Sequence, residues 1–99
     1  MLEEYKSFLS TLTRLSREEE EALWKQYKEE GLLEARQSII EHYQPLVFRE
    51  AMKYGLQEAV TLDLIQEGTV GLMESVERFR PSLGVAFSLY ALHRVRGRM

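Results

Sequence analysis

The chain has 99 residues, a length that fits one domain. Hydrophobic residues make up 44% of it, enough for one modest core, and charged residues make up 29%. Cysteine is absent, so disulfide bonds, thiolate metal sites and cysteine nucleophiles are excluded. The two histidines, His42 and His93, lie far apart in the sequence, and we therefore expect neither a metal site nor another cofactor.

The sequence predicts no membrane span, because it contains no run of about 18 apolar residues. Its first ten residues carry acids where a signal peptide has a basic end, so we expect a cytoplasmic protein. No nucleophile paired with a base and no phosphate-binding loop is visible, and an enzyme is therefore not expected.

Charge is distributed unevenly along the chain, whose net charge is -3. Residues 1–50 contain eleven acids and seven bases, a net charge of -4, whereas residues 78–99 contain five arginines and no acid, a net charge of +5. Such a basic patch favours binding to phosphate, and a basic helix end that complements its own dipole is the alternative. The five arginines are Arg78, Arg80, Arg94, Arg96 and Arg98.

The hydrophobic pattern is helical throughout and predicts an all-α fold, a compact bundle of about four helices in one domain over residues 1–99. The amphipathic pattern of residues 1–14 indicates an additional short helix before the first of the four. That first helix is expected over residues 17–30, because Ser16 and Glu19 have the spacing of a capping box.

The second and third helices follow from apolar residues at helical spacing. The second is expected over residues 32–54, with Pro45 inside it, and proline should kink or divide a helix at that point. The third is expected over residues 62–79, with Thr61 as its N-terminal cap.

Two glycines one turn apart in the third helix, Gly68 and Gly71, indicate close packing of another backbone, since each costs up to about 1 kcal/mol in a helix interior. Pro81 and Gly84 then interrupt the chain before a fourth helix over residues 85–99. This helix stops without a cap at the last residue. We interpret the chain as a fragment of a longer protein, and a naturally short protein is the alternative.

The fourth helix sorts into two faces at about 100° per residue. Its predicted core side is apolar and consists of Ala91, Leu92, Val95 and Met99. The opposite face mixes aromatic and basic side chains: Phe87, Tyr90, His93, Arg94 and Arg98. Aromatic rings stack on unpaired bases, worth about 1–3 kcal/mol per base, and arginines bind phosphates, so this face favours single-stranded nucleic acid. The alternative is that Phe87 and Tyr90 pack beneath the preceding helix.

Residues 63–73 read DLIQEGTVGLM, and this stretch resembles the second conserved region of bacterial sigma-70-family RNA polymerase sigma factors. The resemblance is collinear over roughly residues 13–99. It includes the segments 15–20, 43–47, 77–79, 87–91 and 94–99.

The end of the chain resembles the flagellar and sporulation types of alternative sigma factor more than the housekeeping type. His93 and Arg94 stand where the housekeeping type carries a pair of tryptophans, and Arg98 stands where small residues are usual. The family's C-terminal helix-turn-helix domain, which reads the minus-thirty-five element, has no counterpart in this sequence. The resemblance therefore implies an excised core-binding and melting domain or a naturally truncated relative.

The implied fold is a sigma region-2-like helical domain. It has an N-terminal helical segment over residues 1–31, followed by core-binding and promoter-melting helices over residues 32–99. The third helix would dock on the coiled coil of the β′ subunit of the RNA polymerase core, and a solvated acidic face is the alternative. The matching residues are Asp63, Gln66, Glu67, Thr69 and Met73.

The resemblance also implies that the fourth helix binds the non-template strand of the promoter minus-ten element. A flipped adenine would stack on Tyr90, with Phe87 as its neighbour. His93 would lie at the upstream fork of the melted DNA. Three arginines would contact phosphates: Arg94, Arg96 and Arg98.

The alternative function is a helical protein-interaction module without DNA activity. It would occupy the polymerase or an anti-sigma factor as a decoy or regulator. Phe87 and Tyr90 discriminate between the two functions. Burial of both rings in the core disfavours DNA capture, whereas an open groove that they line beside the arginines favours it.

Overall fold

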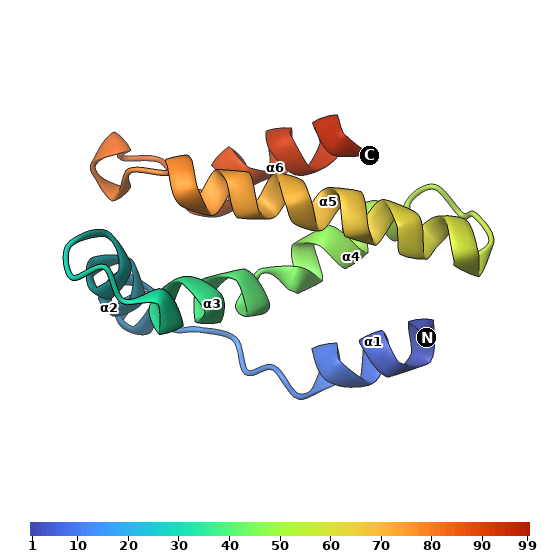
Figure 1. Ribbon diagram of the computed structural model, residues 1–99, viewed down its shortest axis with the longest axis horizontal. Coiled ribbons are helices and arrows are strands. Elements are labelled where there is room, and N and C mark those ends of the chain that lie inside the picture. The colour runs from blue at the N-terminus through green and yellow to red at the C-terminus, as the bar shows by residue number, and fades with distance from the viewer.

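One long helix, α5, runs through the length of the molecule, and the other elements pack around it (Figure 1). The computed structural model describes all 99 residues and contains no strand, so the prediction of an all-helical chain is confirmed. No helix is long and apolar enough to span a membrane. The six α-helices are α1 (Leu2–Ser10), α2 (Arg17–Lys28), α3 (Leu33–His42), α4 (Gln44–Met52), α5 (Glu58–Arg78) and α6 (Phe87–Arg98), and a 3-10 turn over Pro81–Leu83 precedes α6.

The chain forms six helices rather than about four, for two reasons. The amphipathic segment at the N-terminus folds as α1, and a linker over residues 11–16 separates it from α2. The expected helix over residues 32–54 is divided into α3 and α4, with Pro45 in the first turn of α4. A proline is tolerated at that point, because its missing N–H would have had no partner within the helix. The expected effect of Pro45 is therefore confirmed.

The N-termini of α2 and α5 show one correct and one wrong expectation. The Glu19 amide donates to the Ser16 hydroxyl at 3.1 Å and the Ser16 amide donates to the Glu19 carboxylate at 2.9 Å, which confirms the capping box. The expected cap at Thr61 is wrong, because α5 already begins at Glu58, with Gln57 as its N-cap. Thr61 lies buried inside the helix. The residues expected to dock on the polymerase therefore lie one turn further from the N-terminus of α5 than predicted.

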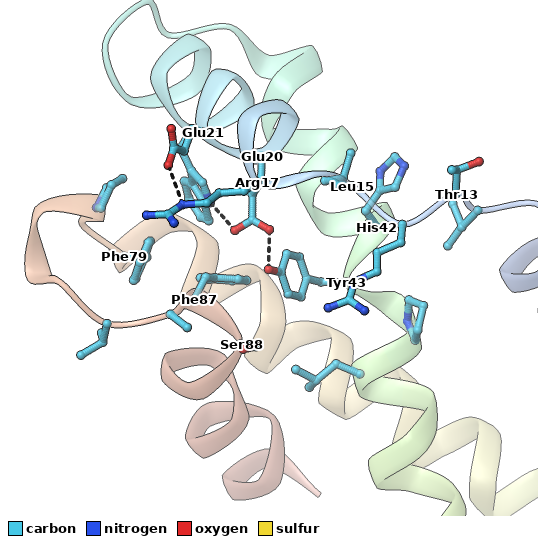
Figure 2. Close-up of a pocket in the computed structure, with 18 of the residues that line it drawn as sticks. Thr13, Leu15, Arg17, Glu20, Glu21, His42, Tyr43, Phe79, Phe87 and Ser88 are labelled. Atoms are coloured by element: carbon cyan, nitrogen blue, oxygen red, sulfur yellow. Dashed lines mark hydrogen bonds and ion pairs between the residues drawn. The ribbon is translucent and has the colours of Figure 1, made fainter.

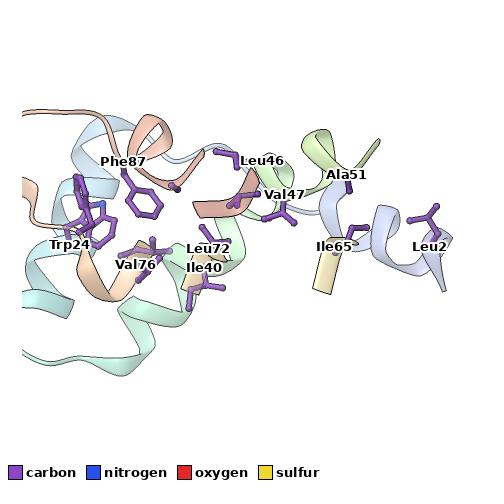
Figure 3. Close-up of a cluster of buried hydrophobic side chains, with 14 residues drawn as sticks. Leu2, Trp24, Ile40, Leu46, Val47, Ala51, Ile65, Leu72, Val76 and Phe87 are labelled. Atoms are coloured by element: carbon purple, nitrogen blue, oxygen red, sulfur yellow. The ribbon is translucent and has the colours of Figure 1, made fainter. Parts of the chain in front are cut away.

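A single hydrophobic core extends along α5 (Figure 3). At one end it contains Leu2, Ala51 and Ile65, and at the other end it contains Trp24 and Phe87. Two of the four residues predicted for the core side of α6 are completely buried, and the other two are half-buried against the core. The buried pair is Ala91 and Val95, and the half-buried pair is Leu92 and Met99.

The contact between α5 and α6 depends on the two glycines of α5. A methyl group at Gly71 would lie 2.5 Å from the carbonyl oxygen of Arg94, and one at Gly68 would lie 2.5 Å from the side chain of Met99. At Gly71 the obstacle is backbone, which cannot turn aside as a flexible side chain can. The predicted close approach of another backbone is therefore confirmed at Gly71, and that backbone belongs to α6, whereas Gly68 faces side chains only.

We expect Gly71→Ala to lower the free energy of unfolding by at least about 1 kcal/mol, because overpacking costs more than the gain in helix propensity returns. The matched control is Gly97→Ala in α6, where a methyl group meets nothing within 4 Å. This control should stabilise the protein by up to about 1 kcal/mol. Urea denaturation followed by circular dichroism measures both changes, and equal effects of the two substitutions would contradict the prediction.

Candidate functional site

The side of α5 that faces away from the other helices carries a mixed acidic and apolar stripe. Its residues recur at alternating spacings of three and four, which keeps them on one face of a helix. Asp63, Gln66 and Glu67 are exposed, and none of them makes an ion pair or a side-chain hydrogen bond within the chain. We call this surface the α5 stripe, and its members are Val60, Asp63, Gln66, Glu67, Val70, Met73 and Glu74.

Four of the five residues predicted to dock on the polymerase lie together on the α5 stripe, namely Asp63, Gln66, Glu67 and Met73. The fifth, Thr69, is half-buried on the flank of the helix. Its hydroxyl donates to the Ile65 carbonyl at 2.7 Å and lies 3.3 Å from the amide oxygen of Gln44. Its polar group is thus already bonded within the chain.

Two exposed apolar residues of the α5 stripe were not predicted as site residues. Val60 and Val70 are 43% and 39% exposed, although valine is commonly buried. The signal was present in the sequence, because both valines continue the spacing of Asp63 and Glu67. The stripe therefore offers apolar contact area as well as negative charge.

The expectation that Phe87 lies on the exposed face of α6 is wrong. Its ring is 2% exposed and packs against Trp24, Phe79 and Tyr43, with ring centroids 4.8 to 5.2 Å away. The physical reason is that Phe87 lies one helical turn before the buried Ala91 and so points toward the same core. Phe87 is therefore not free to stack on a base.

The other aromatic residue of the expected DNA-binding face is better placed. Tyr90 is half-buried, and its ring lies 5.3 Å from that of Phe79. His93, three residues further along the same flank of α6, is exposed, and the neighbouring Arg94 is half-buried. Neither basic residue makes an ion pair within the chain. The structure thus brings Tyr90, His93 and Arg94 together on one flank.

The remaining two arginines of α6 are paired with carboxylates of other helices. Arg96 donates to Glu50 of α4 at 2.7 Å, and Arg98 donates to Glu74 of α5 through two nitrogens, at 2.7 and 3.2 Å. The Arg98 hydrogen bonds hold the pKa of the Glu74 carboxyl below its usual range. The basic patch seen in the sequence is therefore partly neutralised in the fold.

Arg78, Arg80 and Arg94 make no ion pair. Two of these three arginines flank Phe79, the residue on which Tyr90 packs. The unpaired positive charge is thus concentrated around the start of α6 and the turn before it, rather than at the C-terminal end of α6.

A groove of about 1030 Å³ is lined by the aromatic rings of Trp24, Tyr43, Phe79 and Phe87 (Figure 2). The linker between α1 and α2 forms one wall together with α2, and the other wall consists of the junction of α3 and α4 and the segment that leads from Phe79 into α6. Glu20 lies in the groove and accepts a hydrogen bond of 2.6 Å from the hydroxyl of Tyr43. Burial is the larger cause and this hydrogen bond the smaller cause of a raised pKa of the Tyr43 phenol. The hydroxyl therefore stays protonated and acts as the donor. Two arginines without an ion pair, Arg14 and Arg49, also line the groove.

These features together define an all-helical domain with one acidic and apolar face and one aromatic and basic face. Residues 39–99 match the family described as Sigma-70 region 2, and the chain belongs to this family. The RNA polymerase sigma factor FliA of Escherichia coli K12 is 37% identical to it over 76 residues, which cover 74% of this chain and 31% of the relative. FliA of the strains CFT073 and O157:H7 gives the same values. The chain thus spans about a third of the length of these curated relatives.

The ion pair between Glu50 and Arg96 predicts how stability depends on pH. Hydrogen bonds from Arg96, and then from Lys53, lower the pKa of Glu50 in the folded protein. A lowered pKa stabilises the fold above the unfolded value of about 4.3, and this stabilisation is lost as the pH falls through the folded pKa. We therefore expect the free energy of unfolding to decrease on acidification below about pH 5, and Glu50→Gln to make that decrease shallower.

At neutral pH, Glu50→Gln should cost about 1 kcal/mol, because Arg96 is about half exposed and solvent screens the pair. The control is Glu21→Gln, which breaks an exposed pair with Arg17 and should change stability by less than about 0.5 kcal/mol. Denaturation curves at several pH values provide the measurement. An unchanged pH dependence in Glu50→Gln would show that this pair does not contribute.

Proposed function

We propose that this chain is a sigma-factor domain that docks on the RNA polymerase core and binds the non-template strand of the promoter minus-ten element. The observation that carries the proposal is that α5 contributes to both surfaces. Its outward side forms the α5 stripe, and its inward side holds α6, whose flank presents Tyr90, His93 and Arg94. Both surfaces lie within the residues that match the family.

The α5 stripe supports docking on a coiled coil of the polymerase β′ subunit. Unpaired carboxylates of Asp63 and Glu67 are suited to cationic side chains of a partner helix. The exposed side chains of Val60, Val70 and Met73 add apolar area along the same stripe. A helix with this spacing packs well against other helices, because its residues at intervals of three and four form a continuous ridge.

The flank of α6 supports binding to single-stranded DNA. Tyr90 supplies an aromatic surface for one flipped base, and Arg94 and His93 lie beside it to bind the phosphate backbone. The groove beside Phe87 and Ser88, on the other side of Phe79, adds two further unpaired arginines, Arg14 and Arg49. In this proposal Phe79 supports the stacking ring, and Phe87 packs against Phe79 in the core and does not itself contact DNA.

A protein-interaction module without DNA activity is the second candidate function. It is favoured by the burial of Phe87 and by the ion pairs of Arg96 and Arg98, which reduce the surface free for DNA. In that case the α5 stripe would occupy the polymerase, or an anti-sigma factor, as a decoy or regulator. A test of DNA binding by the polymerase-bound chain separates the two functions.

The docking surface is tested by the double variant Gln66→Ala with Glu67→Ala. We expect its affinity for the isolated β′ coiled coil to fall by at least about tenfold, because two hot-spot side chains at the centre of the stripe are lost. Titration calorimetry or fluorescence anisotropy measures the change.

The matched control for docking is Glu29→Ala with Glu30→Ala, which removes two exposed acids after α2, away from the α5 stripe. This control should bind normally although it loses more charge. If both double variants bind equally well, or if the parent chain does not bind at all, the docking proposal is wrong.

The DNA-binding surface is tested by Tyr90→Ala in complex with the polymerase core. Its affinity for a single-stranded minus-ten oligonucleotide should fall by about 5- to 100-fold, as expected for the loss of one base-stacking contact. Tyr54→Ala is the matched control, because Tyr54 is 51% exposed at the end of α4, outside both surfaces. Equal affinities of the two variants would favour the module without DNA activity.

A further inference from the structure

A row of aromatic rings connects α2 to the surface of α6. The ring of Trp24 lies 5.0 Å from that of Phe79, and Phe79 lies 5.3 Å from Tyr90. Both pairs are tilted, an arrangement that is favourable between aromatic rings. Trp24 is 4% exposed and Tyr90 is half-buried. The row therefore runs from the interior of the protein to the flank that is proposed to bind DNA.

Glu20 fixes the orientation of Trp24, the buried end of this row, by a hydrogen bond. One oxygen of its carboxylate accepts a hydrogen bond from the indole nitrogen of Trp24 at 3.2 Å, and the other accepts from the Tyr43 hydroxyl at 2.6 Å. Trp24 and Tyr43 both pack against Phe87, with centroid distances of 4.9 and 4.8 Å. Figure 3 shows Trp24 beside Phe87 at one end of the core. A single carboxylate thus orients two of the rings that enclose Phe87.

Tyr90 depends on this row because Phe79 is its only aromatic neighbour. Phe79 is the C-terminal cap of α5: its amide donates to the Ser75 carbonyl, and its extended backbone turns the chain out of the helix. Its ring is held between Trp24 and Phe87. A smaller side chain at Trp24 would leave space behind Phe79, and the support beneath Tyr90 would be lost.

We propose that Trp24 is a positioning residue for the base-binding ring of Tyr90, acting through Phe79, and that Glu20 fixes Trp24 for this purpose. The inference rests on the proposed function of Tyr90. Trp24 does not touch DNA itself, since it is buried. Helix α2 precedes the residues that match the family, and in this proposal it contributes to the DNA-binding site.

The test compares two single-stranded oligonucleotides that differ only at the flipped position, where one carries adenine and the other an abasic site. With the chain bound to the polymerase core, Trp24→Leu should weaken binding of the adenine oligonucleotide by about three- to tenfold. Binding of the abasic oligonucleotide should change by less than about twofold. In a Tyr90→Ala background Trp24→Leu should have no additional effect, because coupled residues are not additive.

A second variant and a spectroscopic signal keep the inference testable if Trp24→Leu does not fold. Glu20→Gln leaves the aromatic rings in place and removes one acceptor, so it should cause a smaller, adenine-dependent loss. Glu21→Gln, one residue further and outside the network, is the matched control. Because Trp24 is the only tryptophan of this chain, 5-fluorotryptophan introduced before assembly with the unlabelled core reports on it alone, and its fluorine signal should shift when the adenine oligonucleotide binds, and not with the abasic one.

The outcomes separate the inference from the proposed function. If Trp24→Leu and Glu20→Gln weaken both oligonucleotides equally, or retain their full effect in the Tyr90→Ala background, the positioning role is overturned and DNA binding by Tyr90 stands. If the parent chain shows no preference for adenine over the abasic site, the proposed function of Tyr90 is overturned, and the role of Trp24 with it.

Discussion

The arrangement of this domain depends on the backbone contact between α5 and α6. At Gly71 the carbonyl oxygen of Arg94 occupies the space of a side chain, so the two helices lie as close as their backbones allow. This approach brings the inward residues of α6 against Leu72 and Val76 at the centre of the core. It also leaves α5 with one free side, and the acidic and apolar residues of the α5 stripe are found there.

The close packing of α5 and α6 places the two proposed interfaces on one pair of helices. Asp63 and Glu67 of the α5 stripe have no ion-pair partner within the chain and only Glu74 is paired, whereas the flank of α6 carries Tyr90 and the unpaired Arg94. The N-terminal helices complete the structure from the other end, since α2 supplies Trp24 and Glu20 to the aromatic group beneath Tyr90. The two proposed interfaces thus share one core.

Local signals in the sequence predicted the features that depend on neighbouring residues. The capping box at Ser16, the division of a helix near Pro45 and the close approach at Gly71 all follow from short-range chemistry. Phe87 was misplaced because it was grouped with the aromatic and basic residues, although its spacing of four from Ala91 puts it on the core side. Its partners Trp24 and Tyr43 are distant in the sequence, so the contacts that bury it were not visible. The pairing of Arg96 with Glu50 was invisible for the same reason, because 46 positions separate them.

The bond between Arg98 and Glu74 connects the α5 stripe to the C-terminal end of α6. Glu74 belongs to the α5 stripe, and Arg98 belongs to the last turn of α6. An anion that takes the two Arg98 nitrogens bonded to Glu74 displaces this carboxylate, and a cation that takes both Glu74 oxygens displaces the guanidinium. Each ligand therefore removes the competitor of the other, and thermodynamic linkage requires the mutual increase in affinity to be equal in both directions. This ion pair thus couples the binding of a cation at Glu74 to the binding of an anion at Arg98.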